Sequence, residues 1–413
     1  MYTRVSSSTV YAQALDRLQQ RQADMSDAQQ RMTSGKRVLE ASDDPTAAAR
    51  AERARAMLQR AEAEQRAVDA SRNAMTLSES ALGDGVDLLQ QARELVVSAG
   101  NATYSDAQRR DVAQQLEALR KQLLSIANRS DGAGGTIFGG QGASDPPFID
   151  EPGGVGFRGL GGEVVTASRD ALPLTVDGEQ AFLYATTGNG SFETVNVGYL
   201  DALDASPSAS AAPAAWIDGG RVSDANQLPA DGFSYTLTFS VSSGVTQYTI
   251  DRGTLPPVGP VDYQAGKAIE VDGMSFAISG QPADGNQFLI RDASPALNIF
   301  SALDRIVAGL RHTPSSTATV TQTVQKGLGD IDAGIDSLQS ARSRCGELLN
   351  RIDGVDSRLQ DQVLMGENTR SDAEDLDMAQ AISDFENQQT GYNAALRTYA
   401  SVQRMSLFDY LSS

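Results

Sequence analysis

Residues 33–50 read TSGKRVLEASDDPTAAAR and separate two helical patterns. Within this segment, Asp43-Asp44-Pro45 is typical of a helix start. An aspartate before the first turn accepts hydrogen bonds from free amide groups, and proline fits the first helical position. The segment therefore predicts a helix that begins at about residue 45, directly after an earlier helix.

On the N-terminal side of this segment, apolar residues recur in steps of four and three along residues 11–32. The same steps return along residues 378–399. A stripe this narrow cannot bury itself, so each helix needs a partner helix. Two interpretations stay open: an ordinary bundle helix, or a coiled coil between the chain's own ends or between subunits. We expect subunit contacts from Tyr11, Leu15, Leu18, Met25, Met32, Ile382, Phe385, Tyr392, Leu396, Tyr399 and Phe408.

More long helices are predicted inside these ends. Apolar residues between positions 58 and 96 fall on one heptad face. Ser105 with Gln108 three residues later is a capping box, which predicts a helix over residues 105–128. A further apolar seam predicts a helix over about residues 316–366.

Composition divides the chain into three parts. One proline lies in residues 1–140, twelve lie in 141–295 and one lies in 296–413, and the middle part is also glycine-rich, with a net charge of −13. Because proline and glycine disfavour helices, the outer parts can be helical and the middle part cannot be mostly so. We therefore expect an α+β fold, in which a discontinuous long-helix coiled-coil domain from both chain ends carries an inserted acidic β domain.

Within the middle part, three segments have strand character. Residues 233–248 alternate between apolar and polar side chains, with a plausible hairpin turn at Ser242-Ser243-Gly244. Residues 268–278 and 286–290 have a similar pattern.

Composition also excludes several classes of function. The net charge of −19 disfavours nucleic acid as a ligand, because phosphate binding needs basic surface. One cysteine and one histidine leave no disulfide framework, no cysteine-based zinc site and few acid–base designs. No apolar run is long enough to cross a membrane, and no cleavable signal peptide is visible. We expect no enzyme activity, no cofactor and no metal.

Individual motifs also favour structural roles. Residues 154–159 match G-x-G-x-x-G, but no helix is predicted to follow, as a dinucleotide site requires. Asp330, Asp332 and Asp336 are interpreted as solvated helix carboxylates rather than a calcium loop. His312 is expected at a helix end or in a loop, and Cys345, on an apolar seam, as a buried thiol.

Two pairs of neighbouring acidic residues are candidates for acid–base chemistry. Asp43-Asp44 is interpreted as a helix cap. Glu374-Asp375, close to Asp377, is placed on a charged helix face. Neither pair is expected to carry acid–base chemistry.

Residues 33–50 resemble the signature of bacterial flagellins and their relatives, in which S/T-G-K/R is followed by D-D-P/A and small residues. Within that superfamily, three further segments resemble the hook-associated protein 3 group: residues 3–6 (TRVS), residues 136–140 (TIFGG) and residues 405–411 (MSLFDYL). The resemblance covers about residues 1–140 and 296–413, and the middle part carries no recognisable signature.

This resemblance implies a structural protein of the hook–filament junction. Its members are exported by the flagellar type III machinery without signal cleavage, and the location is extracellular. The implied partners are other copies of the chain in a ring of eleven, hook-associated protein 1, flagellin and an export chaperone. Two alternatives are a filament flagellin and, more distantly, a coiled-coil adhesin or signalling protein.

Overall fold

The computed structural model describes residues 7–132, 134–141, 146–151, 154–199, 214–230, 232–312 and 316–411, with side chains between positions 12 and 401. The chain forms two compact units: unit 1 contains residues 1–66 and 355–413, and unit 2 contains residues 67–354. Helices α2 (Pro45–Ala99) and α7 (Thr317–Glu374) each contribute to both units. The three-part division expected from composition is a separate proposal, which these units do not test.

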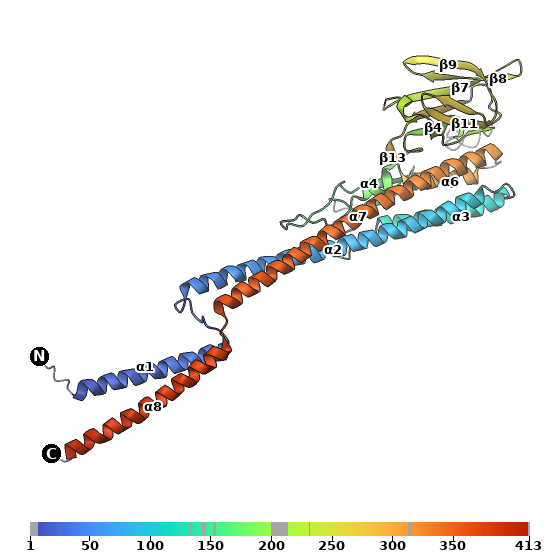
Figure 1. Ribbon diagram of the computed structural model, residues 1–413. Helices are drawn as coiled ribbons and strands as arrows, with labels where there is room; N and C mark the ends of the chain where they lie inside the picture. Colours follow the sequence, from blue (N-terminus) through green and yellow to red (C-terminus); the bar gives the residue numbers. More distant parts are fainter. Residues whose placement is uncertain are drawn as a thin grey trace. The chain divides into compact units, whose positions relative to one another are not determined.

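In unit 1, the two chain ends form a helix pair. Helix α1 (Ser7–Ser34) lies beside α8 (Met378–Leu411), as Figure 1 shows. Both predicted terminal helices are confirmed, and they meet as a pair within one chain.

The predicted helix start at Pro45 is also confirmed. Asp44 Oδ1 accepts hydrogen bonds from the amides of Thr46 and Ala47 at 3.1 and 3.0 Å. These bonds satisfy donors that have no partner inside the helix. The backbone hydrogen bond from Ala47 is the largest of the effects that lower the pKa of Asp44 to about 2, followed by the side chain of Thr46.

Unit 2 contains the helical core. The heptad face of α2 is buried at Met75, Leu82, Leu89 and Val96. Helix α3 (Asp106–Ala127) begins with the predicted capping box at Ser105 and packs against α6 (Ile299–Arg311). Helix α7 ends at Glu374, beyond the predicted boundary at 366, because no glycine or proline interrupts residues 367–374.

Aromatic side chains fill the space beside these helices. Phe138, Phe148, Phe182 and Phe300 form a cluster with ring centroids 5.4 to 6.3 Å apart. They come from the loop after α3, from β1 (Phe148–Glu151), from α4 (Gly178–Leu183) and from α6. Strand β2 (Gly154–Phe157) pairs with β1 and contains the first four residues of the glycine motif at residues 154–159. No helix begins directly after this motif, as predicted.

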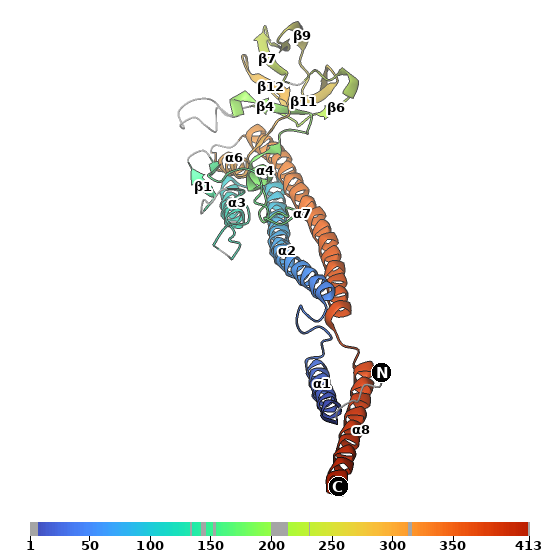
Figure 2. The same ribbon diagram turned by 90° about the vertical axis from the view of Figure 1, so that its left-hand side faces the viewer.

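The middle of the chain forms two main antiparallel sheets, seen beside α6 and the start of α7 in Figures 1 and 2. The first has the order β4-β12-β7-β8-β9 and the second has β10-β11-β5, with β6 also paired to β11. We call residues 185–297 the β region. The strand bounds are β3 Ala185–Thr186, β4 Phe192–Asn196, β5 Ala215–Ile217, β6 Arg221–Val222, β7 Ser234–Ser242, β8 Val245–Arg252, β9 Leu255–Asp262, β10 Ala268–Val271, β11 Met274–Gly280, β12 Gln287–Asp292 and β13 Pro295–Leu297.

All three predicted strand segments are confirmed. The segment 233–248 forms the β7–β8 hairpin, and Ser243 and Gly244 take φ values of 52° and 80° in its turn. Alternate residues such as Tyr235, Leu237 and Phe239 enter the core between the sheets. A short helix, η1 (Ala225–Gln227), lies between β6 and β7. The expected fold class is therefore confirmed.

Candidate functional site

The terminal helix pair contains every residue predicted to carry subunit contacts. Helix α1 ends where α8 begins, since Lys36 and Asp375 form a backbone bridge, and Arg21 lies against Gly391 about halfway along. The two helices therefore run antiparallel. The side chains of Tyr11 and Phe408 lie outside the described residues.

Each predicted stripe splits into two flanks. The inner flank lies toward the partner helix: Leu18 is 8% exposed and the others are partly buried. The outer flank remains open to solvent, with Leu15 and Ile382 both 47% exposed and Leu396 39% exposed. The inner flank consists of Leu18, Met25, Met32, Phe385, Tyr392 and Tyr399.

The outer flank follows directly from heptad geometry. Two positions in each heptad are apolar, but a single partner helix at this contact covers only one of them. Gln22, Gln29 and Gln389 interrupt the outer flank and are exposed, which limits its apolar area. Exposed apolar side chains that lie close together are typical of interaction surfaces, and Leu15, Ile382 and Leu396 are the exposed apolar members of the outer flank.

A second feature of interest is where the β region meets α7. Gln322 Oε1 accepts the amide of Ile217 at 3.0 Å, and its Nε2 donates to the carbonyl of Ile217 at 3.3 Å. Asn196 Nδ2 donates to the carbonyl of Ala215 at 3.0 Å. These side chains satisfy the free edge of β5, which would otherwise be buried without partners.

A network of charges joins β4 and β12 to α6 and α7. Lys326 Nζ lies 2.7 Å from Glu193 Oε1 and 2.8 Å from Asp330 Oδ1. Arg291 also contacts Glu193 at 2.7 Å, and Arg305 contacts Asp330 at 3.3 Å. We call these five residues the anchor network.

Burial and charge oppose each other in this network. Burial raises the pKa of Glu193, but Lys326 and Arg291 outweigh it, so the net pKa is lowered. Burial lowers the pKa of Lys326, but Asp330 and Glu193 outweigh it, so the net pKa is raised. Both groups are therefore held in their charged forms, as buried ion pairs require.

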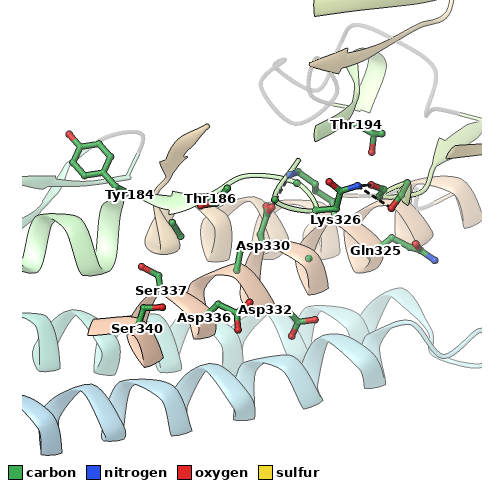
Figure 3. Close-up of a pocket in the computed structure, with 18 of the residues that line it drawn as sticks. Tyr184, Thr186, Thr194, Gln325, Lys326, Asp330, Asp332, Asp336, Ser337 and Ser340 are labelled. Carbon is green, nitrogen blue, oxygen red and sulfur yellow. Dashed lines mark hydrogen bonds and ion pairs between the residues drawn. The ribbon is translucent and has the colours of Figure 1, made fainter. Parts of the chain in front are cut away.

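An open groove of about 690 Å³ runs along α7 next to this network, as Figure 3 shows. Its lining mixes polar and apolar groups, and most of the charges in it already have partners. Lys326 and Asp330 belong to the anchor network, Asp332 pairs with Arg93 at 2.7 Å, and Arg344 donates to Gln180 at 2.9 Å. These contacts connect α7 to neighbouring elements. The charged side chains of the groove form no pair of nucleophile and general base.

Asp330 corrects one expectation. Asp332 and Asp336 are partly or fully exposed, as predicted, but Asp330 is only 3% exposed. Its position on α7 turns it toward α6 and β4, where Lys326 and Arg305 compensate its charge. Within the described ranges, no group of three or more metal-ligating side chains is placed to hold an ion.

The candidate reactive residues have structural positions. Cys345 is buried, as predicted, and burial raises its thiol pKa to about 11, which disfavours the nucleophilic thiolate. His312 caps the end of α6, and its amide donates to the carbonyl of Ala308 at 3.0 Å. No helix in the described part of the chain could span a membrane.

Glu374 corrects a second expectation. It was placed on a charged helix face, yet it is only 3% exposed and contacts three cations. One of these, Arg370, precedes it by four residues, and that spacing is a sequence signal for an ion pair. Lys36 and Arg55 come from distant positions, and no local pattern indicates them.

Comparison with known proteins gives consistent matches. The bacterial flagellin N-terminal helical region matches residues 5–143, and the bacterial flagellin C-terminal helical region matches residues 328–411. Together the two matches cover more than half of the chain. They include both helices of the terminal pair completely.

Individual relatives differ in how much of this chain they match. Flagellar hook-associated protein 3 of Escherichia coli K12 is 24% identical over 405 residues, which is 98% of each chain. A flagellin of Listeria monocytogenes is 23% identical over 128 residues, 31% of this chain and 45% of its own. The crystal structure of the flagellar junction protein FlgL from Legionella pneumophila has a TM-score of 0.62 at 26% identity, covering 71% of this chain and 95% of that one.

Proposed function

Because this chain belongs to the flagellin superfamily and is similar to flagellar hook-associated protein 3 over 98% of its length, we propose that it forms a ring which joins the flagellar hook to the filament. Its family is a structural component of the flagellum and not an enzyme family. The observation that carries the proposal is the extent of the match. Similarity to hook-associated protein 3 extends over 98% of the chain, including the β region, whereas similarity to the Listeria flagellin extends over 31%.

The terminal helix pair supplies the assembly mechanism. The inner flank pairs α1 with α8 inside each subunit, and the outer flank stays available to neighbouring subunits. Fully burying a leucine or isoleucine that starts fully exposed contributes about 1.5–3 kcal/mol. Leu15, Ile382 and Leu396 are 39% to 47% exposed in the single chain, so covering each contributes roughly half of that, and the three add up around a ring. This gain offsets the entropy lost when the helices are ordered.

The proposed partners follow from the position of the ring. Neighbours within the ring are copies of the same chain, eleven in all, with hook-associated protein 1 on the hook side and flagellin on the filament side. Before assembly, an export chaperone holds the C-terminal helix, and the chain leaves the cell through the flagellar export machinery without cleavage of a signal peptide.

A clean deletion in the source bacterium tests the role. We expect electron microscopy to show complete hooks without filaments, and flagellin to appear in the medium as monomer. Loss of flagellin itself, with hooks and their associated rings intact, would instead identify a filament subunit. Normal motile filaments would contradict the proposal and favour a coiled-coil protein of another system.

A point variant tests the mechanism. Leu396→Asp places a charge on the outer flank and should abolish incorporation into the flagellum, while Trp216 fluorescence shows that the β region is still folded. The matched control is Ala394→Asp, which adds the same charge at an exposed position on the opposite side of α8. Normal incorporation of the Leu396→Asp protein would count against the outer flank as an assembly surface.

A further inference from the structure

The sheet β4-β12-β7-β8-β9 has two outer strands, of which β4 is buried and β9 is exposed. All five residues of β4 are buried, whereas seven of the eight residues of β9 are exposed and the eighth, Val258, is partly buried. Figures 1 and 2 show β9 on the side of the sheet away from α6 and α7. Because an outer strand presents unpaired N–H and C=O groups, β9 is the edge at which a strand from another molecule could be added.

Exposed apolar side chains lie on this edge and on the neighbouring hairpin. Leu255 and Val261 belong to β9, and Val241 and Val245 lie at the end of the β7–β8 hairpin; all four are between 38% and 49% exposed. An exposed outer strand that carries apolar side chains is a typical site of aggregation. Without features that oppose pairing, β9 would therefore join readily to the edge of a second copy.

The composition of β9 opposes such pairing. Three of its eight residues are prolines, namely Pro256, Pro257 and Pro260, and all three are exposed. Proline has no N–H group, so it cannot donate a hydrogen bond to an added strand. The prolines are spread along the strand, so they interrupt the row of donors in both of its halves.

The register of β9 against β8 is irregular at the same positions. Leu255 and Val258 pair with Arg252 and Ile250, so β9 contains one extra residue there, and a second extra residue lies between Val258 and Val261. The three prolines lie in these two bulges. A β-bulge bends its strand and disrupts the regular spacing of the backbone groups. An added strand would therefore meet neither a straight edge nor evenly spaced partners.

A side chain also occupies one acceptor of β9. Arg252 donates from Nε and Nη2 to the carbonyl of Pro256 at 2.9 and 2.7 Å, and from Nη1 to Asp272 Oδ1 at 2.8 Å. Asp272, in the turn between β10 and β11, also accepts the hydroxyl of Tyr235 at 2.7 Å. The guanidinium is thus fixed from both sides, and it competes with any added strand for the carbonyl in the first bulge.

We propose that β9 is an edge built to exclude strand addition: its prolines, its two bulges and the Arg252 contact prevent the β regions of different copies from joining through their sheets. This inference goes beyond the junction ring and concerns the β region alone. Its consequence is greatest in an assembly, because neighbouring copies are then held at high local concentration and an unprotected edge would pair most readily.

The test restores an edge that can pair. Pro256→Thr with Pro257→Thr returns two N–H groups in a residue type that favours strands. A second variant deletes Pro256 and Pro260 and carries Pro257→Thr, so it also removes the extra residue from each bulge and gives β9 the spacing of β8. The matched control is Pro146→Thr with Pro229→Thr, which makes the same two exchanges outside the strands.

Sedimentation velocity over a series of concentrations measures self-association of the purified full chain. The double threonine variant should associate at concentrations about tenfold lower than the wild type, because each restored donor adds a hydrogen bond and a two-fold symmetric pair uses each donor twice. The deletion variant should associate at lower concentrations still. Association through other surfaces is common to all of these proteins, so the control should match the wild type.

Two further measurements identify the cause of any association. Trp216 fluorescence shows whether the β region remains folded. Hydrogen exchange shows whether residues 255–262 become protected when the variants associate, as strand pairing requires.

Several outcomes would overturn the proposal. It fails if both β9 variants associate no more than the control, or if they associate without protection of residues 255–262. Should both variants fail to fold, the single exchange Pro257→Thr decides the question, and association equal to that of the wild type is then a negative result. Failure here leaves the junction ring untouched, because the assay involves neither the hook nor the filament.

Discussion

Gln322 on α7 and Ile217 on β5 exchange two hydrogen bonds through the side chain of the glutamine and the backbone of the isoleucine. The side-chain amide of Gln322 thus acts as a neighbouring strand for the edge of the sheet. The β region is therefore attached to the helical core by directional bonds as well as by the anchor network.

This relationship predicts that Gln322→Leu destabilises the protein by about 2–4 kcal/mol, since it leaves two buried backbone groups without partners. Urea unfolding followed by the fluorescence of Trp216, the residue next to Ile217, measures the effect. Gln325→Leu is the matched control, because Gln325 is exposed one turn further along α7. Equal midpoints for the two variants would contradict this account.

The anchor network predicts how stability depends on pH. The pKa of Glu193 is lowered in the folded state, so its contribution is present above its ordinary value of 4.5 and is lost as pH falls through the folded pKa. The pKa of Lys326 is raised, so its contribution is present below 10.5 and is lost as pH rises through the folded pKa. Unfolding midpoints of unit 2 should therefore decline at both extremes. Glu193→Gln should flatten the acid side, and an unchanged acid profile would argue against the network.

The two flanks of the terminal pair should respond differently to truncation. Phe385→Ala removes an inner-flank ring and should destabilise pairing of α1 with α8 by about 1–3 kcal/mol, less than for a fully buried phenylalanine. Ile382→Ala removes an exposed side chain and should leave the pair unchanged in the isolated chain. Trypsin cleavage at Arg397, which is exposed on α8, provides the measurement. Similar cleavage rates for both variants would mean that the flanks are not distinct.

Cys345 should be unreactive in the folded protein. Its burial and its raised pKa, about 11, both disfavour the thiolate that attacks labelling reagents. We expect a thiol reagent at pH 8 to react about a hundredfold or more slowly than in urea, because labelling requires local opening. Rapid labelling in native buffer would show that α7 opens at this position.

Much of the fold follows from local sequence. The steps of four and three at both ends predicted the terminal helices, Asp44-Pro45 predicted the start of α2, and Ser105 predicted the cap of α3. The β7–β8 hairpin followed from alternation and its turn residues. These features depend on side chains within a few positions of one another, and propensity and periodicity report that range well.

The tertiary structure decided which residues connect one helix to another. Periodicity defined an apolar stripe on each terminal helix, but only the partner's position separated Leu18 inside from Leu15 outside. The i,i+4 spacing indicated Arg370 as a partner of Glu374 and Lys326 as a partner of Asp330, but it gave no sign that either acid would be buried or that Lys36, Arg55 and Arg305 would join them. The physical reason is distance along the chain. The amino-acid sequence by itself determined the elements and their faces, because these depend on neighbours. Burial of a charge depends on partners that folding brings from tens to hundreds of residues away, and only the tertiary structure places them.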